Sequence, residues 1–510
     1  MKYLHLLLCC LTLGCNFHSE TIVDTDKGKI EGRYNTDKTV RIFKGIPFAS
    51  PPVGNLRWKA PQPVLSWNGI LQCTEFGPSP IQNTPEPFYC WTEEFIALPE
   101  PLNEDCLYLN VWTTAKNKTE KQPVFVWIYG GGLSSGSANC AIYDGEELAK
   151  KGVVFVSFNY RVGILGFMAH PELTAESGKN ASGNYGIMDQ IAALKWIKNN
   201  IASFGGDPNN VTIAGQSAGA FSVNTLIASP LSDELFHKAI LQSGGLLGST
   251  RTQSLADAEA TGIRFMEKVK ATTINELRNL PAKDVHLISN DTNVGRFGIT
   301  TEGYVVPKDI IGHFKNGRQH QIPIISGWVT GDGNFLGDNE MTVEAYYNEA
   351  QEEYGAKASD FLTIFPAETK KDVKKVKSKL GMLHFAGVPS HLLATYNTQP
   401  TYLYQFGHVP PDKQGFPNYG AFHTSDVPYT LHTLHTWKRN WQPSDKMIED
   451  VLSSYWVNFA KTGNPNNDGL PTWNSYDEQT GNIMVIKDNE PNSEEGFLGN
   501  ELKFLTINRD

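Results

Sequence analysis

The stretch VTIAGQSAGA at residues 211–220 decides the fold of this chain. Its first four residues, 211–214, are the β-branched and apolar run typical of a buried strand. A tight turn with Ser217 at its centre follows, and small apolar residues then begin a helical pattern. Gly215 and Gly219 flank the serine in a G-x-S-x-G sequence, because larger side chains there would crowd so sharp a strand-to-helix turn. The stretch predicts a serine hydroxyl exposed at the edge of a sheet.

The segment before this strand is predicted to be helical. Between residues 185 and 204, apolar side chains recur every three or four positions on one helical face: Ile187, Ile191, Leu194, Ile197 and Ile201. The pattern ends at GGDP, residues 205–208, where glycine can take the left-handed terminal conformation and proline prevents continuation. An amphipathic helix therefore leads into the strand.

Other runs along the chain are typical of buried parallel strands: 123–129, 153–160, 323–328 and 401–406. The order strand, helix, strand implies right-handed crossovers and a doubly wound sheet. We predict an α/β protein with a large central, mostly parallel sheet flanked by helices, forming one domain over residues 21–510. Helical stretches near 252–290 and 342–378 are expected to cap the site.

The composition limits the classes of function. Of 510 residues, 40% are hydrophobic and 19% charged, which supports a large core and excludes wholesale disorder. Lys plus Arg number 44 against 54 Asp plus Glu, for a net charge of −10, and no basic stripe is present. This balance argues against a nucleic-acid partner.

The first residues are typical of an export signal. Lys2 precedes a mostly apolar run over residues 4–14, which is too short to span a bilayer. Residues 11–15, LTLGC, resemble a bacterial lipobox that would place a lipid anchor on Cys15. We predict a signal peptide over residues 1–20 and an exported protein, either secreted, periplasmic or anchored as a lipoprotein; a buried helix is the alternative interpretation.

Four cysteines lie beyond the signal: Cys73, Cys90, Cys106 and Cys140. In an oxidising compartment they allow three complete pairings. A short loop from Cys90 to Cys106 is one possibility, but thiols in so large a core can equally stay unpaired. No CxxC spacing occurs, so a thiolate zinc site is not predicted. Oligomeric state and glycosylation also stay open.

A run of glycines, Gly130 to Gly132, follows the predicted strand 123–129. Without side chains, the backbone N–H groups of such a loop can approach a substrate oxygen, as an oxyanion hole requires. The phosphate-binding patterns GxxxxGK[ST] and GxGxxG are absent from this run. We expect the N–H groups of Gly131, Gly132 and Ala218 to be the donors.

Several stretches together resemble the type-B carboxylesterase and cholinesterase-like family of the α/β-hydrolase fold. They are FKGIPFASPPVGNLRW (43–58), EDCLYLNVW (104–112), YGGG (129–132), FNYRVG (158–163) and the whole segment 184–220. The resemblance covers nearly all of the chain after the signal. It implies an α/β-hydrolase fold and a serine esterase that uses no metal or other cofactor on a small-molecule ester.

A serine nucleophile needs a base and an orienting acid, here expected in the chain order serine, acid, histidine. Asp332 follows the strand 323–328 in GWVTGDG, where the family carries Glu or Asp before glycine. Asp332 is therefore the predicted acid, with Asp338 and Glu340 as fallbacks. Ser243, in LQSG, matches a family segment in which the serine supports the acid.

His423 is the predicted base. It lies in GAFHTSDVPY, residues 420–429, which resembles the family segment GAxHxxDxPY. His408 is the second choice. His432 and His435 are three residues apart and could bind a metal ion, but no companion carboxylate motif supports that alternative.

Two residues bear on the substrate. Gln216 stands where much of the family has glutamate, so a negative charge is missing beside the nucleophile and cationic choline esters are disfavoured. Trp91 could line the site as a platform for a cation, although packing is the commoner role of such an aromatic side chain. The sequence predicts a serine carboxylesterase for small or medium neutral esters, with a long-chain lipase or a noncatalytic adhesion-type relative as alternatives.

Overall fold

The computed structural model describes residues 20–248, 251–333, 341–487 and 491–507. The run predicted to be an export signal, with Cys15, lies outside the described residues apart from Glu20. The fallback acids Asp338 and Glu340 also lie outside them.

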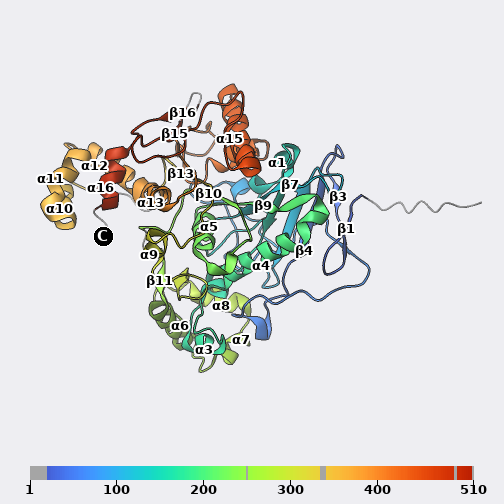
Figure 1. Cartoon of the computed structure of the whole chain (residues 1–510). Helices are drawn as coiled ribbons and strands as arrows, with labels where there is room; N and C mark the ends of the chain where they lie inside the picture. The colour runs from blue at the N-terminus through green and yellow to red at the C-terminus, as the bar shows by residue number, and fades with distance from the viewer. Residues whose placement is uncertain (1–19, 249–250, 334–340, 488–490, 508–510) are drawn as a thin grey trace, which may run out of the picture.

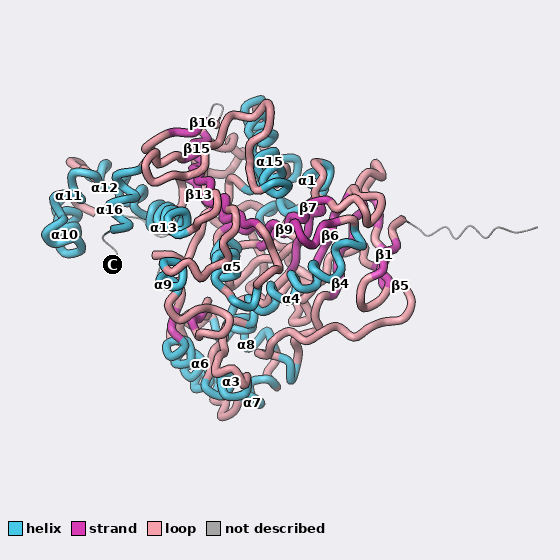
Figure 2. The backbone as a smooth tube through the Cα atoms, viewed as in Figure 1, coloured by secondary structure: helices cyan, strands magenta, loops and turns pink. Residues whose placement is uncertain are grey.

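A mixed sheet of eleven strands runs through the described part of the molecule (Figures 1 and 2). In spatial order its strands are β16 (Asn492–Glu494), β15 (Ile483–Ile486), β14 (Thr401–Phe406), β13 (Ile324–Val329), β10 (Lys238–Gln242), β9 (Gly206–Gln216), β7 (Gln122–Ile128), β8 (Val154–Phe158), β6 (Tyr108–Thr113), β4 (Arg41–Pro47) and β3 (Arg33–Tyr34). Pairing is parallel from β15 to β8 and antiparallel at both ends. The prediction of a large, mostly parallel sheet is confirmed.

The central strands are the predicted ones with shifted ends. β14 spans the predicted residues, whereas β9 begins at Gly206, five residues before the predicted start, because its first residue pairs with Gln122 of β7. β10 was not predicted, although all five of its residues are buried between β9 and β13. So short an apolar run carries no periodicity that distinguishes a strand from a helix.

Helices cover both faces of the sheet. α4 (Tyr185–Asn200) continues into a 3₁₀ turn over Ile201–Phe204 and ends at Gly205, whose φ of 84° is left-handed, as the sequence predicted. α4 and α5 (Ala218–Ala228) lie on one side, and α1 (Glu146–Lys150) and α15 (Pro443–Thr462) lie on the other (Figure 1). This arrangement follows from right-handed crossovers between parallel strands.

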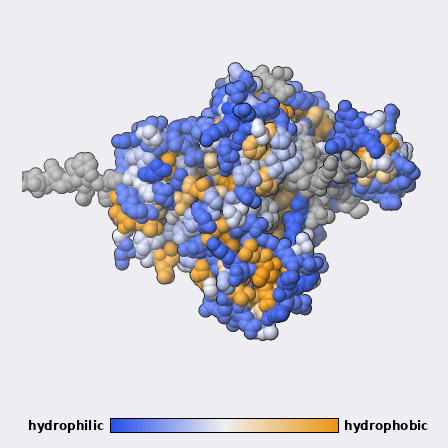
Figure 3. All heavy atoms as spheres, turned by 180° about the vertical axis from the view of Figure 1, so that it is seen from behind, coloured by the Kyte–Doolittle hydropathy of each residue, from blue (hydrophilic) through white to orange (hydrophobic). Residues whose placement is uncertain are grey.

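The two predicted helical excursions are present. The first contains α6 (Leu255–Val269), α7 (Ile274–Arg278) and α8 (Ala282–Ser289) and forms the lower part of the molecule in Figure 1. The second contains α10 (Val343–Tyr354), α11 (Ala358–Ile364) and α12 (Lys370–Met382) and projects beside α16 (Gly499–Ile507). Seen from behind, hydrophilic side chains cover most of this projecting lobe, whereas apolar side chains gather on the lower part (Figure 3).

All four cysteines beyond the predicted signal are free and buried. The possible Cys90–Cys106 disulfide is therefore not formed, and each thiol packs in the core as a small apolar side chain. Burial raises the pKa of the Cys73 and Cys90 thiols to about 12. Within the described ranges, no helix combines the length and apolarity needed to cross a bilayer.

Candidate active site

The predicted strand-to-helix turn is present at Ser217. β9 ends at Gln216, α5 begins at Ala218, and Ser217 between them has φ 57° and ψ −121°. A non-glycine residue with positive φ stores about 1–3 kcal/mol of backbone strain, which the surrounding structure must hold in place. The Ser217 N–H donates to the Gln242 carbonyl of β10 at 2.9 Å. A Cβ at Gly219 would lie 2.0 Å from the Ile128 carbonyl oxygen, so the neighbouring strand requires glycine there.

The glycine run after β7 lies directly against this turn. A Cβ at Gly130 would come within 2.8 Å of the Gln216 carbonyl oxygen and 3.0 Å of the Ser217 Cβ. Gly131 has φ 105°, and a Cβ there would lie 2.3 Å from the Ser135 carbonyl oxygen. Gly132 has φ 63°. The loop can adopt this conformation only because its glycines have no side chains, and its backbone passes beside Ser217.

Asp332 and His423 form a buried pair. The Asp332 Oδ1 lies 2.6 Å from the His423 Nδ1, and the Asp332 Oδ2 accepts from the Val329 N–H at 3.0 Å. The loops that carry the two residues are joined by their backbones, since the Gly331 N–H donates to the Ala421 carbonyl at 2.9 Å. Asp332 is fully buried and His423 is 4% exposed. The Asp332 carboxylate therefore holds the Nδ1 side of the His423 imidazole in place.

The other side of the imidazole meets Gln216 and two aromatic rings. The Gln216 Nε2 lies 3.1 Å from the His423 Nε2. Phe385 and Trp91 contact the imidazole edge to face, with ring centroids 5.3 and 6.2 Å away. The Trp91 Nε1 also donates to the Thr424 hydroxyl at 3.1 Å. Trp91 therefore lies at the site and packs against the histidine.

Asp426 is a second buried carboxyl near this pair, and the sequence analysis did not single it out. Its Oδ2 accepts from the Gln242 Nε2 at 3.0 Å and from the Tyr404 hydroxyl at 2.7 Å. Burial raises the pKa of Asp426 to about 6, with a smaller contribution from the charge of Asp332. Its place three residues after His423 in the GAFHTSDVPY segment was the available signal.

Ser243 occupies a left-handed position, with φ 53°, and donates its N–H to the Gly327 carbonyl at 2.8 Å. Its side chain is buried, but the hydroxyl has no hydrogen-bond partner within the described part of the chain. The expected support of Asp332 by this hydroxyl is therefore not seen as a hydrogen bond.

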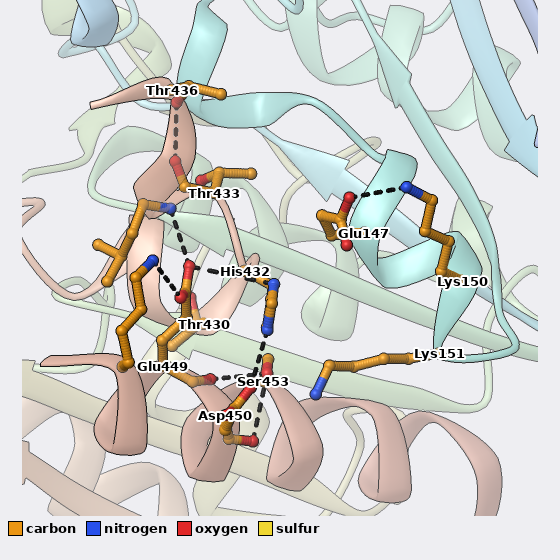
Figure 4. Close-up of polar contacts among 12 residues, drawn as sticks. Glu147, Lys150, Lys151, Thr430, His432, Thr433, Thr436, Glu449, Asp450 and Ser453 are labelled. Atoms are coloured by element: carbon orange, nitrogen blue, oxygen red, sulfur yellow. Dashed lines mark hydrogen bonds and ion pairs between the residues drawn. The ribbon is translucent and has the colours of Figure 1, made fainter. Parts of the chain in front are cut away.

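The second-choice histidines have other partners. The His408 Nε2 lies 2.7 Å from the Asp445 Oδ1, an oxygen that also accepts from the Tyr429 hydroxyl. Figure 4 shows the His432 imidazole directed at Asp450, with the Nε2 3.0 Å from the Oδ1, and with Glu449 nearby. Among the residues with described positions, no cluster of three or more candidate ligands is arranged to hold a metal ion.

One cavity of about 1910 Å³ joins these elements. Ser217 and His423 line it together with Gly131, Gly132 and Gln216. Both excursions contribute to its wall, the first through residues such as His286 of α8 and the second through α10 and α12. Both helical excursions therefore border the cavity, as expected for segments that cap the site.

Comparison with known proteins identifies the family of the chain. The carboxylesterase family matches residues 19–505. The chain is 35% identical to the fumonisin B1 esterase of Sphingopyxis macrogoltabida, over 91% of this chain and 85% of that protein. It is 32% identical to the para-nitrobenzyl esterase of Bacillus subtilis strain 168, over 93% and 97% of the two chains.

Solved structures point the same way. The carboxylesterase EST55 of Geobacillus stearothermophilus matches with a TM-score of 0.82 at 30% identity, covering 95% of this chain and 99% of that one. The fold is thus that of the α/β-hydrolase carboxylesterases. The chain belongs to the carboxylesterase family and is a carboxylic ester hydrolase.

Proposed function

We propose that the chain hydrolyses small or medium neutral esters through Ser217 as nucleophile, His423 as general base and Asp332 as the acid that orients the base. The observation that carries the proposal is the 2.6 Å contact between the His423 Nδ1 and the Asp332 Oδ1, with His423 lining the same cavity as the strained Ser217. A carboxylate on Nδ1 leaves Nε2 as the proton acceptor and stabilises the imidazolium formed during the reaction.

The reaction proceeds in two halves. The Ser217 Oγ attacks the ester carbonyl carbon while His423 removes the hydroxyl proton. The bond to the alcohol oxygen then breaks, and the departing alkoxide takes the proton from His423, which leaves an acyl-enzyme. His423 next removes a proton from water, the hydroxide attacks the acyl carbon, and release of the acid returns the proton to Ser217.

The negative oxygen of each tetrahedral intermediate would be bound by the N–H groups of Gly131, Gly132 and Ala218. Support comes from the close approach of the Gly130 backbone to Ser217 and from the position of Ala218 at the first turn of α5. The amino end of a helix also favours negative charge. Each donor of this kind contributes about 3 kcal/mol to stabilisation of the transition state.

The nucleophile is tested with 4-nitrophenyl butyrate and the Ser217→Ala variant. We expect loss of essentially all turnover, together with loss of labelling by a fluorophosphonate, while the thermal unfolding temperature is kept. Asp332→Asn should lower kcat by about 10⁴-fold, because the neutral amide cannot hold the imidazolium. Exposed Ser66 lies outside the cavity wall and supplies the control variant Ser66→Ala. Undiminished hydrolysis by Ser217→Ala would refute the assignment.

The size of the acyl group is tested with 4-nitrophenyl esters from acetate to palmitate. We expect kcat/KM to be greatest for the short and medium chains. A maximum at palmitate, with activation by emulsified triglyceride, would instead identify a lipase.

A further inference from the structure

The wall of the active-site cavity carries an excess of positive charge. Its described Lys and Arg side chains are Arg251, Arg296, Lys371, Lys374, Lys375 and Lys377. The described acidic side chains of the wall are Glu86, Glu349 and Glu353. Glu349 is already paired with Lys377 at 2.7 Å. The chain as a whole has a net charge of −10, so the cavity is opposite in sign to the protein around it.

Arg251 brings one of these charges close to the reacting groups. Its guanidinium carbon lies 5.8 Å from the centroid of the Phe221 ring and 5.1 Å from that of the Phe385 ring. Phe221 is one helical turn after Ser217, and its backbone N–H donates to the Ser217 carbonyl at 3.0 Å. Phe385 packs edge to face on the His423 imidazole. A single aromatic ring therefore separates the guanidinium from the proposed base.

A second guanidinium lies near the first. Burial lowers the pKa of Arg251, and the charge of Arg296 lowers it further. Two like charges on one cavity wall repel each other, and an anion placed between them relieves that repulsion. The planar fork of arginine matches the two oxygens of a carboxylate, and it is more weakly hydrated than a lysine ammonium.

The groups beside the nucleophile do not oppose an anion. Gln216 is uncharged, and its side-chain nitrogen rather than a carboxylate lies 3.1 Å from the His423 Nε2. Four lysines of α12 line the same cavity. A cleft with low-dielectric walls and one sign of charge concentrates ligands of the opposite sign.

We propose that the cavity selects esters that carry a carboxylate, which Arg251 binds beside the reacting carbonyl with Arg296 next to it. This inference rests on the proposed function, because it needs the same serine and the same triad, and it changes the preferred substrate of that site from a neutral ester to one that carries a carboxylate. The carboxylate can belong to the acid half of the ester or to its alcohol half, and the binding chemistry is the same in both cases.

Two matched substrate pairs separate these sources. For the acid half, mono(4-nitrophenyl) adipate is compared with its neutral methyl ester. For the alcohol half, 4-butyryloxyphenylacetate is compared with its methyl ester. The readout is the ratio of kcat/KM for the charged substrate to that for its neutral partner. We expect a ratio of about ten or more in one pair, the size of effect that a charge-assisted hydrogen bond gives.

Arg251→Gln and Arg296→Gln should each lower the ratio of kcat/KM values about tenfold, which brings it close to one. Arg251→Lys should keep part of the preference for the charged substrate, because it keeps the positive charge. Exposed Arg318 lies outside the cavity wall, so Arg318→Gln is the control for a lost charge and should leave the ratio unchanged. Added salt should lower the ratio, because it screens the attraction. Thermal unfolding of each variant confirms that it is folded.

Ratios near one in both pairs for the unmodified protein would overturn the inference, as would a ratio that both arginine variants keep. Failure of the proposed function looks different: the neutral esters would then not be hydrolysed, or Ser217→Ala would hydrolyse them as fast as the unmodified protein. The two failures are therefore distinguishable in one set of assays.

Discussion

Replacing Asp426 by asparagine tests how the buried polar groups behind the active site respond to pH. The Asp426 carboxyl is fully buried, and burial raises its pKa from 3.8 to about 6. Its Oδ2 accepts from Gln242 and Tyr404, while its Oδ1 has no hydrogen-bond partner among the described groups. Asparagine has nearly the same shape and can accept the same two hydrogen bonds, but it carries no titrating proton.

The expected effect follows from the difference between the two pKa values. The folded state holds the Asp426 proton more tightly than the unfolded state, so this group stabilises the fold fully below about pH 4 and the contribution is lost as pH rises through about 6. A difference of roughly two pKa units corresponds to a limit of about 3 kcal/mol. Between about pH 4.5 and about pH 7.5, the contribution should fall by about 2 kcal/mol.

The measurement is the free energy of unfolding in urea, followed by tryptophan fluorescence, for the unmodified protein and for Asp426→Asn at several pH values. We expect the unmodified protein to lose about 2 kcal/mol relative to the variant over this range. Exposed Asp468 supplies the matched control Asp468→Asn, whose difference from the unmodified protein should not change with pH in this way. A constant difference for Asp426→Asn, or one that moves in the opposite direction, would refute the reasoning.

Two further predictions concern the glycine loop and the amino terminus. Gly131→Ala places a Cβ 2.3 Å from the Ser135 carbonyl oxygen, so the loop must shift, and kcat for 4-nitrophenyl butyrate should fall by about 10²–10³. Gly178→Ala, where φ is also positive but no atom lies within 4 Å, should leave kcat unchanged; equal effects of both changes would contradict a role for the loop in binding the oxyanion. We also propose that Cys15 is lipidated in a bacterial host: the unmodified protein should incorporate radiolabelled palmitate and sediment with membranes, and Cys15→Ser should do neither, whereas an unlabelled, soluble unmodified protein would contradict the lipobox interpretation.

The sequence by itself determined the class of fold and the position of the strand-to-helix turn that carries the proposed nucleophile. A buried strand, a turn of small residues and a helix are local features, and the residues around Ser217 predict all three in that order. The end of α4 at Gly205 is equally local, because a glycine with positive φ and a following proline end a helix whatever surrounds them. β10 shows the limit of this reasoning, since a run of three apolar residues between a lysine and a glutamine does not reveal that it forms a strand until neighbours pair with it.

Only the tertiary structure decided which distant groups meet. Asp332 and His423 are 91 residues apart, and their contact depends on adjacent loops joined by a backbone hydrogen bond. The same holds for Asp426 behind them, for Arg251 between two aromatic rings, and for the cysteines that stay separate in the core. Distances between side chains from different strands are set by the pairing of those strands and by packing across the sheet. These contacts join residues that are far apart in the sequence, so no pattern of neighbouring residues can predict them.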